Sequence, residues 1–320
     1  MAKKYVIGVD VGGQSAKCGV VNEEGQIVAK TVVKTNDVTE AKVFIATLAE
    51  ALKGLIAEAK AEGCVTGIGV GAPNGNYYTG NIEFAPNLTW TLEGSKVIPF
   101  AEMLSKEMGG IPVTLTNDAN AAAVGEMVYG AAKGMKNFIM ITLGTGVGSG
   151  IVIDGKVVYG HDGFAGELGH VIAVRDNGRK CGCGRRGCLE AYASAIGVER
   201  TAKEWLKASD EPSLLRSMKK ISSKEVYDAA VAGDALALRV FEYTGEILGR
   251  TLADFIAFSA PEAIILFGGL TKARRFLTKP VKKAMNKNVL NIWKNKVKLI
   301  YSKLKASDAA ILGAAALVAE

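Results

Sequence analysis

Short apolar runs alternate along the chain with glycine-rich turns and with one long segment of helical spacing. Three runs near the start, at 5–9, 18–21 and 26–33, predict an antiparallel meander whose first hairpin is rich in glycine. Between residues 39 and 62 apolar residues recur three and four positions apart, which predicts an amphipathic helix. The run at 65–70 predicts a buried strand. These elements indicate an α/β fold.

The opening pattern recurs roughly 130 residues later. Residues 138–142 predict a strand and 143–148 a glycine-rich turn; 149–153 predict a second strand, and an Asp-Gly hairpin leads to a third at 156–159. We infer an internal duplication into two α/β halves. Each half would present a glycine hairpin to the other, so that two phosphate-contacting loops line a cleft. The later chain predicts two helices, a buried strand and a packing helix, at 191–207, 234–259, 263–267 and 306–320.

Composition refines this picture without changing it. A chain of 320 residues with 49% hydrophobic and 22% charged residues is typical of a globular protein with about two domains. Twelve basic and no acidic residues lie between 263 and 307; without those twelve charges the net charge of +7 becomes −5. This local excess indicates a solvated surface or, alternatively, a rim that attracts phosphate. With no export signal and no long apolar span, we expect a cytoplasmic protein that binds no membrane.

One imidazole and three thiols form the strongest chemical pattern in the chain. Three of the five cysteines fall within eight residues, and glycines between them let the backbone turn tightly around an ion. One histidine with three cysteines makes a closed tetrahedral zinc site, which leaves no position for a reactive water. We therefore predict a structural zinc ion; a reduced cysteine loop without metal is the alternative. The ligands are His170, Cys181, Cys183 and Cys188.

Three carboxylates stand near predicted turns. Asp118 lies between an alternating strand at 113–115 and an Ala-rich helix at 119–125, where it could cap the helix or face a cleft as a general base. Glu167 and His170 are three residues apart, so on a helical turn they share a face. Glu190 follows the last cysteine by two residues, and the metal loop would hold it and His170 close to Glu167.

Several of these motifs together resemble the ROK family of sugar kinases and related repressors. The signature segments are 167–170 and 181–190, and four shorter motifs match in the expected order, at 10–13, 116–122, 143–146 and 267–269. The resemblance covers the whole chain. It implies an actin/hexokinase-type (ribonuclease H-like) duplicated fold of two α/β domains around a cleft. The small domain would be 1–117 with the helix 307–320 returning to it, and the large domain 118–306.

The resemblance also implies a reaction, the transfer of the γ-phosphoryl of ATP·Mg²⁺ to the 6-hydroxyl of glucose with Asp118 as general base. The stretch 84–90 is similar to one typical of kinases that act on glucose. His170 would serve twice, with one nitrogen on zinc and the other toward a sugar hydroxyl. Sugar contacts would come from Gly71, Asn87, Asn117, Asp118, Glu167, His170 and Glu190. Nucleotide and magnesium contacts would come from Asp10, Gly12, Gly13, Gln14, Gly144, Thr145, Gly146, Gly268 and Gly269.

Three alternatives remain open at this point. The first is a ROK kinase for N-acetylglucosamine, N-acetylmannosamine, fructose or allose. The second is a ROK regulatory protein that binds sugar without kinase activity; its helix-turn-helix module would need room before the strand at 5–9. The third is a zinc-dependent nucleic-acid binder. We expect no nucleic-acid partner and a homo-oligomer, a dimer or tetramer. Two residues depart from the family pattern, Gln14, where many relatives have Thr, and Asn74, where many have Gly.

Overall fold

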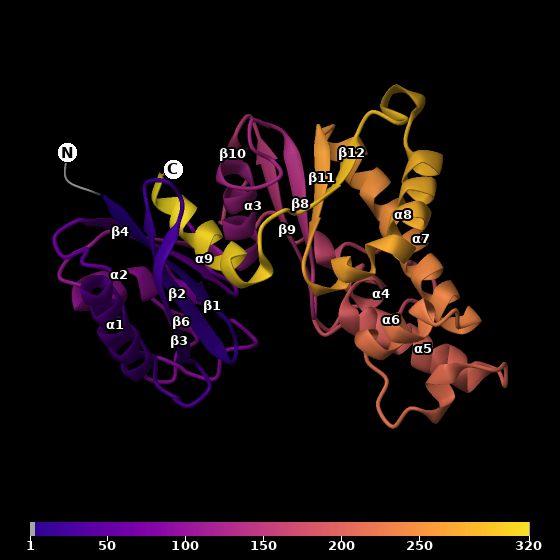
Figure 1. Ribbon diagram of the computed structural model, residues 1–320, viewed down its shortest axis with the longest axis horizontal. Coiled ribbons are helices and arrows are strands. Elements are labelled where there is room, and N and C mark those ends of the chain that lie inside the picture. The colour runs from indigo at the N-terminus through magenta and orange to yellow at the C-terminus, as the bar shows by residue number, and fades with distance from the viewer. Residues whose placement is uncertain (1–3, 320) are drawn as a thin grey trace. The chain divides into compact units, whose positions relative to one another are not determined.

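The computed structural model describes residues 4–319, which divide into two compact units (Figure 1). The first unit takes the chain up to Met135, with Gly150–Gly166 and the segment from Lys303 onward. The second unit takes Lys136–Ser149 and Glu167–Ser302. No helix within residues 4–319 is long and apolar enough to cross a membrane.

The first unit is built on a five-stranded sheet with the order β3-β2-β1-β4-β7. The first three strands form the predicted antiparallel meander, and β4 and β7 then add in parallel. A two-stranded ribbon, β5 and β6, stands apart from this sheet. The bounds are β1 Tyr5–Val11, β2 Ser15–Asn22, β3 Ile27–Lys34, β4 Val65–Ala72, β5 Ile82–Glu83, β6 Val97–Ile98 and β7 Val113–Asn117.

Helices pack on both faces of this sheet. On one face, α1 (Ala41–Glu58) and α2 (Phe100–Glu107) bury Phe44 and Phe100 against the strand residues Ile7 and Val9. Because strand side chains alternate, Gly8 between those two residues turns to the opposite face. There α9 (Ala306–Ala316) lies against β1 and β4, and against α3 (Asp118–Val128).

The close approach of α9 to the sheet depends on glycines in β1 and β4. A Cβ built on Gly8 would lie 2.0 Å from the carbonyl oxygen of Ile311, and one on Gly69 would lie 1.8 Å from that of Ala314. Both distances are far shorter than any van der Waals contact. The helix therefore rests directly on the backbone of β1 and β4.

We expect Gly69→Ala to lower the free energy of unfolding by about 1–3 kcal/mol, because the added methyl group must push α9 away from the sheet. Gly54→Ala is the matched control, since it adds the same methyl to the exposed surface of α1, where nothing lies within 4 Å. That control should be neutral or stabilising by about 0.5–1 kcal/mol. Urea unfolding of both variants measures the difference, and equal effects would contradict the close contact.

The second sheet has the order β10-β9-β8-β11-β12. Position for position this repeats the first sheet: a first strand, two strands added on one side, and two parallel strands on the other. The duplication inferred from the glycine hairpins is thereby confirmed in the topology. The strands are β8 Phe138–Leu143, β9 Val147–Ile153, β10 Lys156–Val157, β11 Ala263–Phe267 and β12 Lys298–Tyr301.

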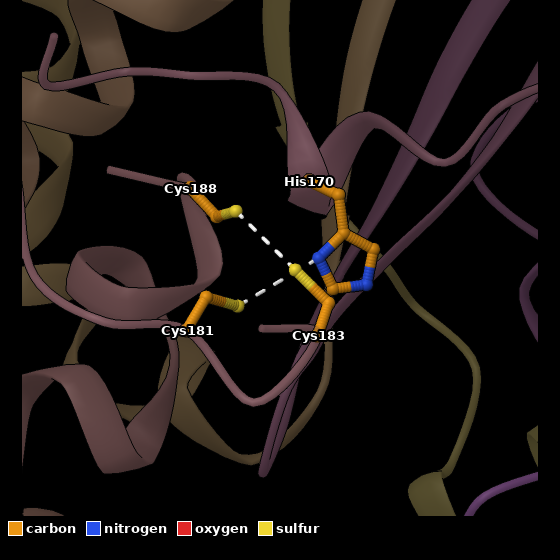
Figure 2. A group of neighbouring side chains, drawn as sticks. All are labelled: His170, Cys181, Cys183 and Cys188. Carbon is orange, nitrogen blue, oxygen red and sulfur yellow. Dashed lines mark hydrogen bonds between the residues drawn. The ribbon is translucent and has the colours of Figure 1, made fainter. Parts of the chain in front are cut away.

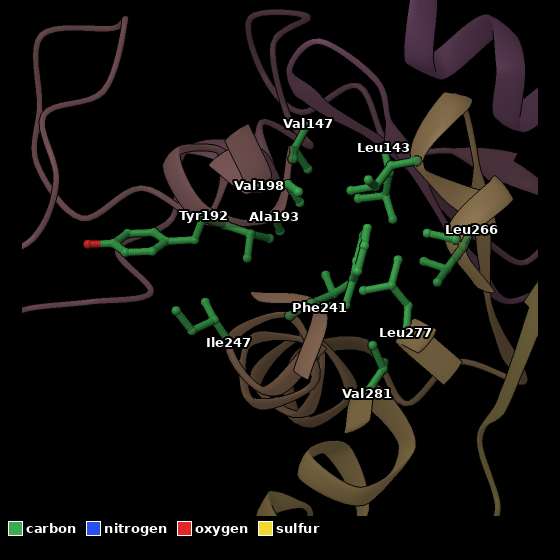
Figure 3. Close-up of a cluster of buried hydrophobic side chains, with 14 of the residues drawn as sticks. Leu143, Val147, Tyr192, Ala193, Val198, Phe241, Ile247, Leu266, Leu277 and Val281 are labelled. Atoms are coloured by element: carbon green, nitrogen blue, oxygen red, sulfur yellow. The ribbon is translucent and has the colours of Figure 1, made fainter. Parts of the chain in front are cut away.

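The helices of the second unit enclose an apolar core around Phe241 and Leu266 (Figure 3). The helix predicted at 191–207 is broken at Ser194, which adopts an extended backbone and accepts a hydrogen bond from the N–H of Gly197. The helices are α4 Glu190–Ala193, α5 Ala195–Ala208, α6 Ser223–Val231, α7 Ala235–Ser259 and α8 Arg274–Asn288. Single 3₁₀ turns are η1 Leu168–His170, η2 Leu214–Ser217, η3 Gly269–Ala273, η4 Asn291–Trp293 and, at the end of the first unit, η5 Leu317–Ala319.

Candidate functional site

Parallel strand register brings four of the predicted residues to one edge of the first sheet. Asp10 on β1 is paired with Gly71 on β4, and the next residue of β4 is paired with Asn117 on β7. Asp118 follows at once as the first residue of α3. The carboxyl ends of parallel strands are the usual place for ligand sites in open α/β sheets. Gly71 packs closely against α3, because a Cβ on it would lie 3.1 Å from the Cβ of Ala121.

The cap of α3 is Asn117 and not Asp118. The Asn117 side chain accepts a 2.8 Å hydrogen bond from the N–H of Ala119, and its backbone is extended. Asp118 already lies within the helix, although its Oδ1 also accepts from the same N–H, at 2.8 Å. Asp118 retains exposed surface, yet its carboxyl group is surrounded by protein atoms and this desolvation raises its pKa.

Asp10 is the second unusual carboxylate at this edge. Burial raises its pKa from 3.8 to about 6, and the negative charge of Asp118 adds to the rise. The ammonium group of Lys17, 3.7 Å away, acts in the opposite direction. Two carboxylates that repel each other at a strand edge are suited to a cation or to a proton transfer.

Asp10→Asn is expected to raise the free energy of unfolding by about 3 kcal/mol at pH 8, because the pKa of Asp10 rises from 3.8 to about 6 and one pKa unit corresponds to about 1.4 kcal/mol. The folded protein binds this proton more tightly than the unfolded chain does. The gain should therefore be absent below about pH 4, grow as the pH rises from 4 to 6, and stay constant above. Urea unfolding at pH 4 and pH 8 measures it. A variant less stable than the parent at pH 8 would mean that the pairing with Lys17 outweighs the burial.

The first glycine turn lies between β1 and β2 and is fixed by its backbone. The N–H of Gly12 donates to the carbonyl of Ser15 at 3.0 Å, and the Thr35 hydroxyl donates to the carbonyl of Gly12 at 2.8 Å. A Cβ on Gly13 would lie 2.6 Å from the carbonyl oxygen of Asn87, so the turn and Asn87 touch. Gln14 has an exposed side chain, and its backbone carbonyl accepts from Thr35.

The structure gives a physical reason for asparagine at position 74, where many members of the family have glycine. Its φ of 50° lies in the left-handed region, which glycine adopts freely and asparagine tolerates better than most residues. Its side-chain amide donates to the carbonyls of Glu83 and Phe84, at 2.9 and 3.3 Å. Asparagine thus keeps the backbone conformation that glycine would give and ties this loop to β5.

The four predicted zinc ligands come together in the second unit (Figure 2). Their ligand atoms all lie within 4.8 Å of one another. The Cys181 Sγ is 3.8 Å from the His170 Nδ1, and the Cys183 and Cys188 sulfurs are 3.7 Å apart. A zinc–sulfur bond of about 2.3 Å in a tetrahedron places ligand atoms about 3.8 Å apart, so the cluster fits zinc. The Nε2 of His170 points away from the sulfurs (Figure 2).

A buried arginine anchors the metal loop to the helices behind it. The Arg179 guanidinium donates to Glu204 and Thr201 on α5 and to the carbonyl of Ala191 on α4. It also stacks on the ring of Tyr192, 4.6 Å from its centre. Because this side chain is 9% exposed, its contacts hold the loop in one position. Sequence reasoning missed Arg179.

Glu167 and Glu190 flank the metal cluster in the chain. Glu167 precedes η1 and is exposed, and its carbonyl accepts from the N–H of His170 at 3.0 Å. Glu190 begins α4; its Oε2 accepts from the N–H of Val147 at 3.0 Å, and its Oε1 lies 3.6 Å from the Cys181 sulfur. Glu190 therefore contacts the metal loop and the turn between β8 and β9, whereas the predicted closeness of Glu190 to Glu167 stays a prediction.

A pocket of about 590 Å³ joins the later glycine motifs. It is lined by Gly144 and Thr145 from the turn between β8 and β9, and by Gly269 from η3. Gly268, with φ 103°, has no room for a side chain because a Cβ would lie 2.6 Å from the carbonyl oxygen of Leu143. Sequence reasoning missed the opposite wall, which comes from α6: Ser223, Lys224, Tyr227 and Asp228.

Comparison with known proteins gives one consistent result. The ROK family model matches residues 6–320. Glucokinases from Halalkalibacterium halodurans and Thermotoga maritima are 39% and 35% identical to this chain, over 88% and 100% of it and 85% and 99% of their own lengths. The structure of a ROK family glucokinase from Streptomyces griseus, in complex with glucose and AMPPNP, is 34% identical with a TM-score of 0.77 and covers 98% of both chains.

These matches also settle the fold class. Solved ROK structures superimpose on nearly the whole chain, among them a ROK hexokinase from Thermus thermophilus with a TM-score of 0.80. The predicted actin/hexokinase-type duplicated α/β fold is confirmed. With the family model covering all but the first five residues, this chain belongs to the ROK family.

Proposed function

We propose that this chain is an ATP-dependent glucokinase that transfers the γ-phosphoryl group of ATP to the 6-hydroxyl of glucose. The observation that carries the proposal is the strand edge at which Asp10, Gly71, Asn117 and Asp118 meet, in a chain whose relatives are named glucokinases. Phosphoryl transfer needs positioned substrates, neutralised phosphates and an acceptor for one proton. This chain offers residues for each.

Asp118 accepts the proton of the attacking hydroxyl in this proposal. A carboxylate whose pKa is raised by burial is a stronger base than an exposed one. With Asn117 as the helix cap, Asp118 is not needed for that structural role. Its backbone stays fixed in the first turn of α3, which suits a group that must meet one particular hydroxyl.

The other sugar hydroxyls would bind to six further residues. Gly71, Asn87 and Asn117 belong to the first unit, and Glu167, His170 and Glu190 to the second. The Cys₃His cluster would hold a structural zinc ion, whose chemistry is to fix the loop and not to activate water. The Nε2 of His170, turned away from the sulfurs, is free of that cluster and suits a sugar hydroxyl.

The nucleotide would be held by the three glycine segments. In the turns at Gly12–Gly13 and at Gly144–Gly146, the N–H groups of Gly13, Thr145 and Gly146 would donate to phosphate oxygens, because those of Gly12 and Gly144 already bond to carbonyls. Gln14 would donate in place of the more frequent threonine. The pocket beside Gly268 and Gly269 would take the adenosine. Mg²⁺ bound to ATP supplies charge neutralisation, and Asp10 would orient it through water.

The test is a coupled ADP-release assay with ATP and Mg²⁺ across glucose, mannose, fructose, N-acetylglucosamine, N-acetylmannosamine and allose. We expect glucose to give by far the highest kcat/KM. A different best sugar would assign the chain to another ROK kinase and leave the base and metal proposals standing. No turnover with any sugar, together with glucose binding in calorimetry, would favour a regulatory sugar-binding protein.

The proposed enzyme needs only small-molecule substrates, acts in the cytoplasm and assembles as a dimer or tetramer. The nucleic-acid alternative rests on the basic segment at 272–305, where all twelve basic side chains are exposed. Binding to DNA would weaken steeply with salt. A gel-shift titration at two salt concentrations should detect no complex, and light scattering gives the oligomeric state.

A further inference from the structure

The turn between β8 and β9 is fastened at two points to one short segment that follows the last cysteine. The Glu190 carboxylate accepts from the N–H of Val147 at 3.0 Å. Five residues later, the N–H of Ala195 donates to the carbonyl of Gly144 at 2.8 Å. Within the hairpin itself, the N–H of Gly144 donates to the carbonyl of Gly146 and the N–H of Gly148 donates to the Thr142 hydroxyl, both at 3.0 Å. The two bonds to the segment after the last cysteine add an external restraint to this turn.

The contact with Glu190 is close enough to restrict the sequence of the turn. A Cβ on Gly146 would lie 2.3 Å from the Glu190 Oε2, which excludes every side chain at this position unless the carboxylate moves. The other oxygen of the same carboxylate lies 3.6 Å from the Cys181 sulfur. One side chain thus bridges the Cys₃His loop and the Gly144–Val147 turn.

We propose that Glu190 is a positioning residue for the donor phosphates, through which the Cys₃His loop shapes the Gly144–Val147 turn. The proposal rests on the proposed function in one respect, that the turn binds phosphate. It adds a second task to a residue assigned so far only to the sugar. A sugar that engages the same carboxylate then changes the turn, so sugar and nucleotide should influence each other's affinity by the same factor.

Three variants separate this task from sugar binding. In Glu190→Gln the amide oxygen can still accept from Val147, whereas in Glu190→Ala nothing can. Gly146→Ala leaves Glu190 chemically intact but forces its carboxylate away from the turn. Gly182→Ala is the matched control, a glycine of the metal loop with nothing within 4 Å of its built Cβ.

The readout is the affinity for AMPPNP without sugar, measured by titration calorimetry, together with zinc content and thermal unfolding. We expect Glu190→Ala and Gly146→Ala to weaken AMPPNP binding about tenfold, Glu190→Gln to retain most of it, and Gly182→Ala to match the parent. Zinc content should be unchanged in all four. A purely structural role would lower stability in proportion to the loss of affinity and would give no recovery in Glu190→Gln.

Unchanged AMPPNP affinity in both Glu190→Ala and Gly146→Ala would overturn the proposal. Its failure can be told from failure of the proposed function, because binding is measured without any sugar. If the parent phosphorylates none of the sugars tested but the variants still lose AMPPNP affinity, the positioning role stands and the sugar assignment falls. Equal loss in Glu190→Gln and Glu190→Ala would also contradict it, since the acceptor oxygen is what the turn requires.

Discussion

Asp118→Asn is expected to lower kcat for glucose phosphorylation by about 10²–10⁴-fold, the usual contribution of a positioned general base, while the KM for glucose changes little. The amide oxygen of asparagine can still accept from the N–H of Ala119, and the cap of α3 is Asn117, so the helix keeps both of its first hydrogen bonds. What disappears is the ability to accept the hydroxyl proton. Steady-state kinetics with the coupled assay measures the loss.

Stability and pH supply the controls for this variant. Because burial raises the pKa of Asp118, the ionised carboxylate destabilises the folded state at neutral pH, and the neutral amide should unfold at an equal or higher temperature. In the parent, kcat/KM should fall as the pH is lowered through this raised pKa, since the carboxylate is the active form. Residual activity above a few per cent with an intact fold would remove Asp118 from the role of base.

The fold was predictable because its pattern occurs twice. Each half opens with a strand, a glycine turn and an antiparallel strand, and the two sheets have the same strand order. The ends of the helices and strands were harder to predict from the sequence. The helix predicted at 191–207 reads as continuous, yet Ser194 interrupts it by capping α5, because a serine that can accept a backbone N–H competes with the helical conformation.

The site was predictable where one motif holds all of its residues. The Cys₃His cluster lies within one segment of chain, and its four ligand atoms do converge. Residues that act through packing gave no such signal. Arg179 reads as one more surface cation, and only the structure reveals its burial. The helix α6, which lines the pocket beside Gly144 and Gly269, could have been predicted, because Ser222 and Glu225 form a capping box that marks the start of a helix.

Asn74 illustrates how a departure from a family pattern can preserve structure. In the sequence alone, asparagine in place of glycine weakens the inference of sugar specificity from this loop. The left-handed φ of 50° shows that the position selects a backbone conformation, which both residues can adopt. Side-chain chemistry then adds two hydrogen bonds that glycine lacks. The sequence alone does not give the backbone conformation at position 74, so the equivalence of asparagine and glycine there could not be predicted from it.

Cys188→Ser is expected to abolish stoichiometric zinc binding and to lower the free energy of unfolding by about 4 kcal/mol or more, a loss of the size that removal of a structural metal produces. Cys188 is fully buried, and its loss leaves three ligands around the ion. Cys64→Ser is the matched control, because Cys64 is half-buried in the first unit and lies outside the cluster. It should retain zinc and unfold like the parent.

The same experiment tests whether the metal loop matters beyond its own stability. Elemental analysis gives the zinc content, and thermal unfolding with and without a chelator gives the stability. In the parent, a chelator should lower the unfolding temperature toward that of Cys188→Ser. Removing the ion and removing one of its ligands both take away the same free energy of metal binding. Because Cys188 is two residues from Glu190, glucose affinity should fall with the zinc. A parent protein purified without zinc, or a Cys188→Ser variant that retains both zinc and stability, would contradict a structural ion here.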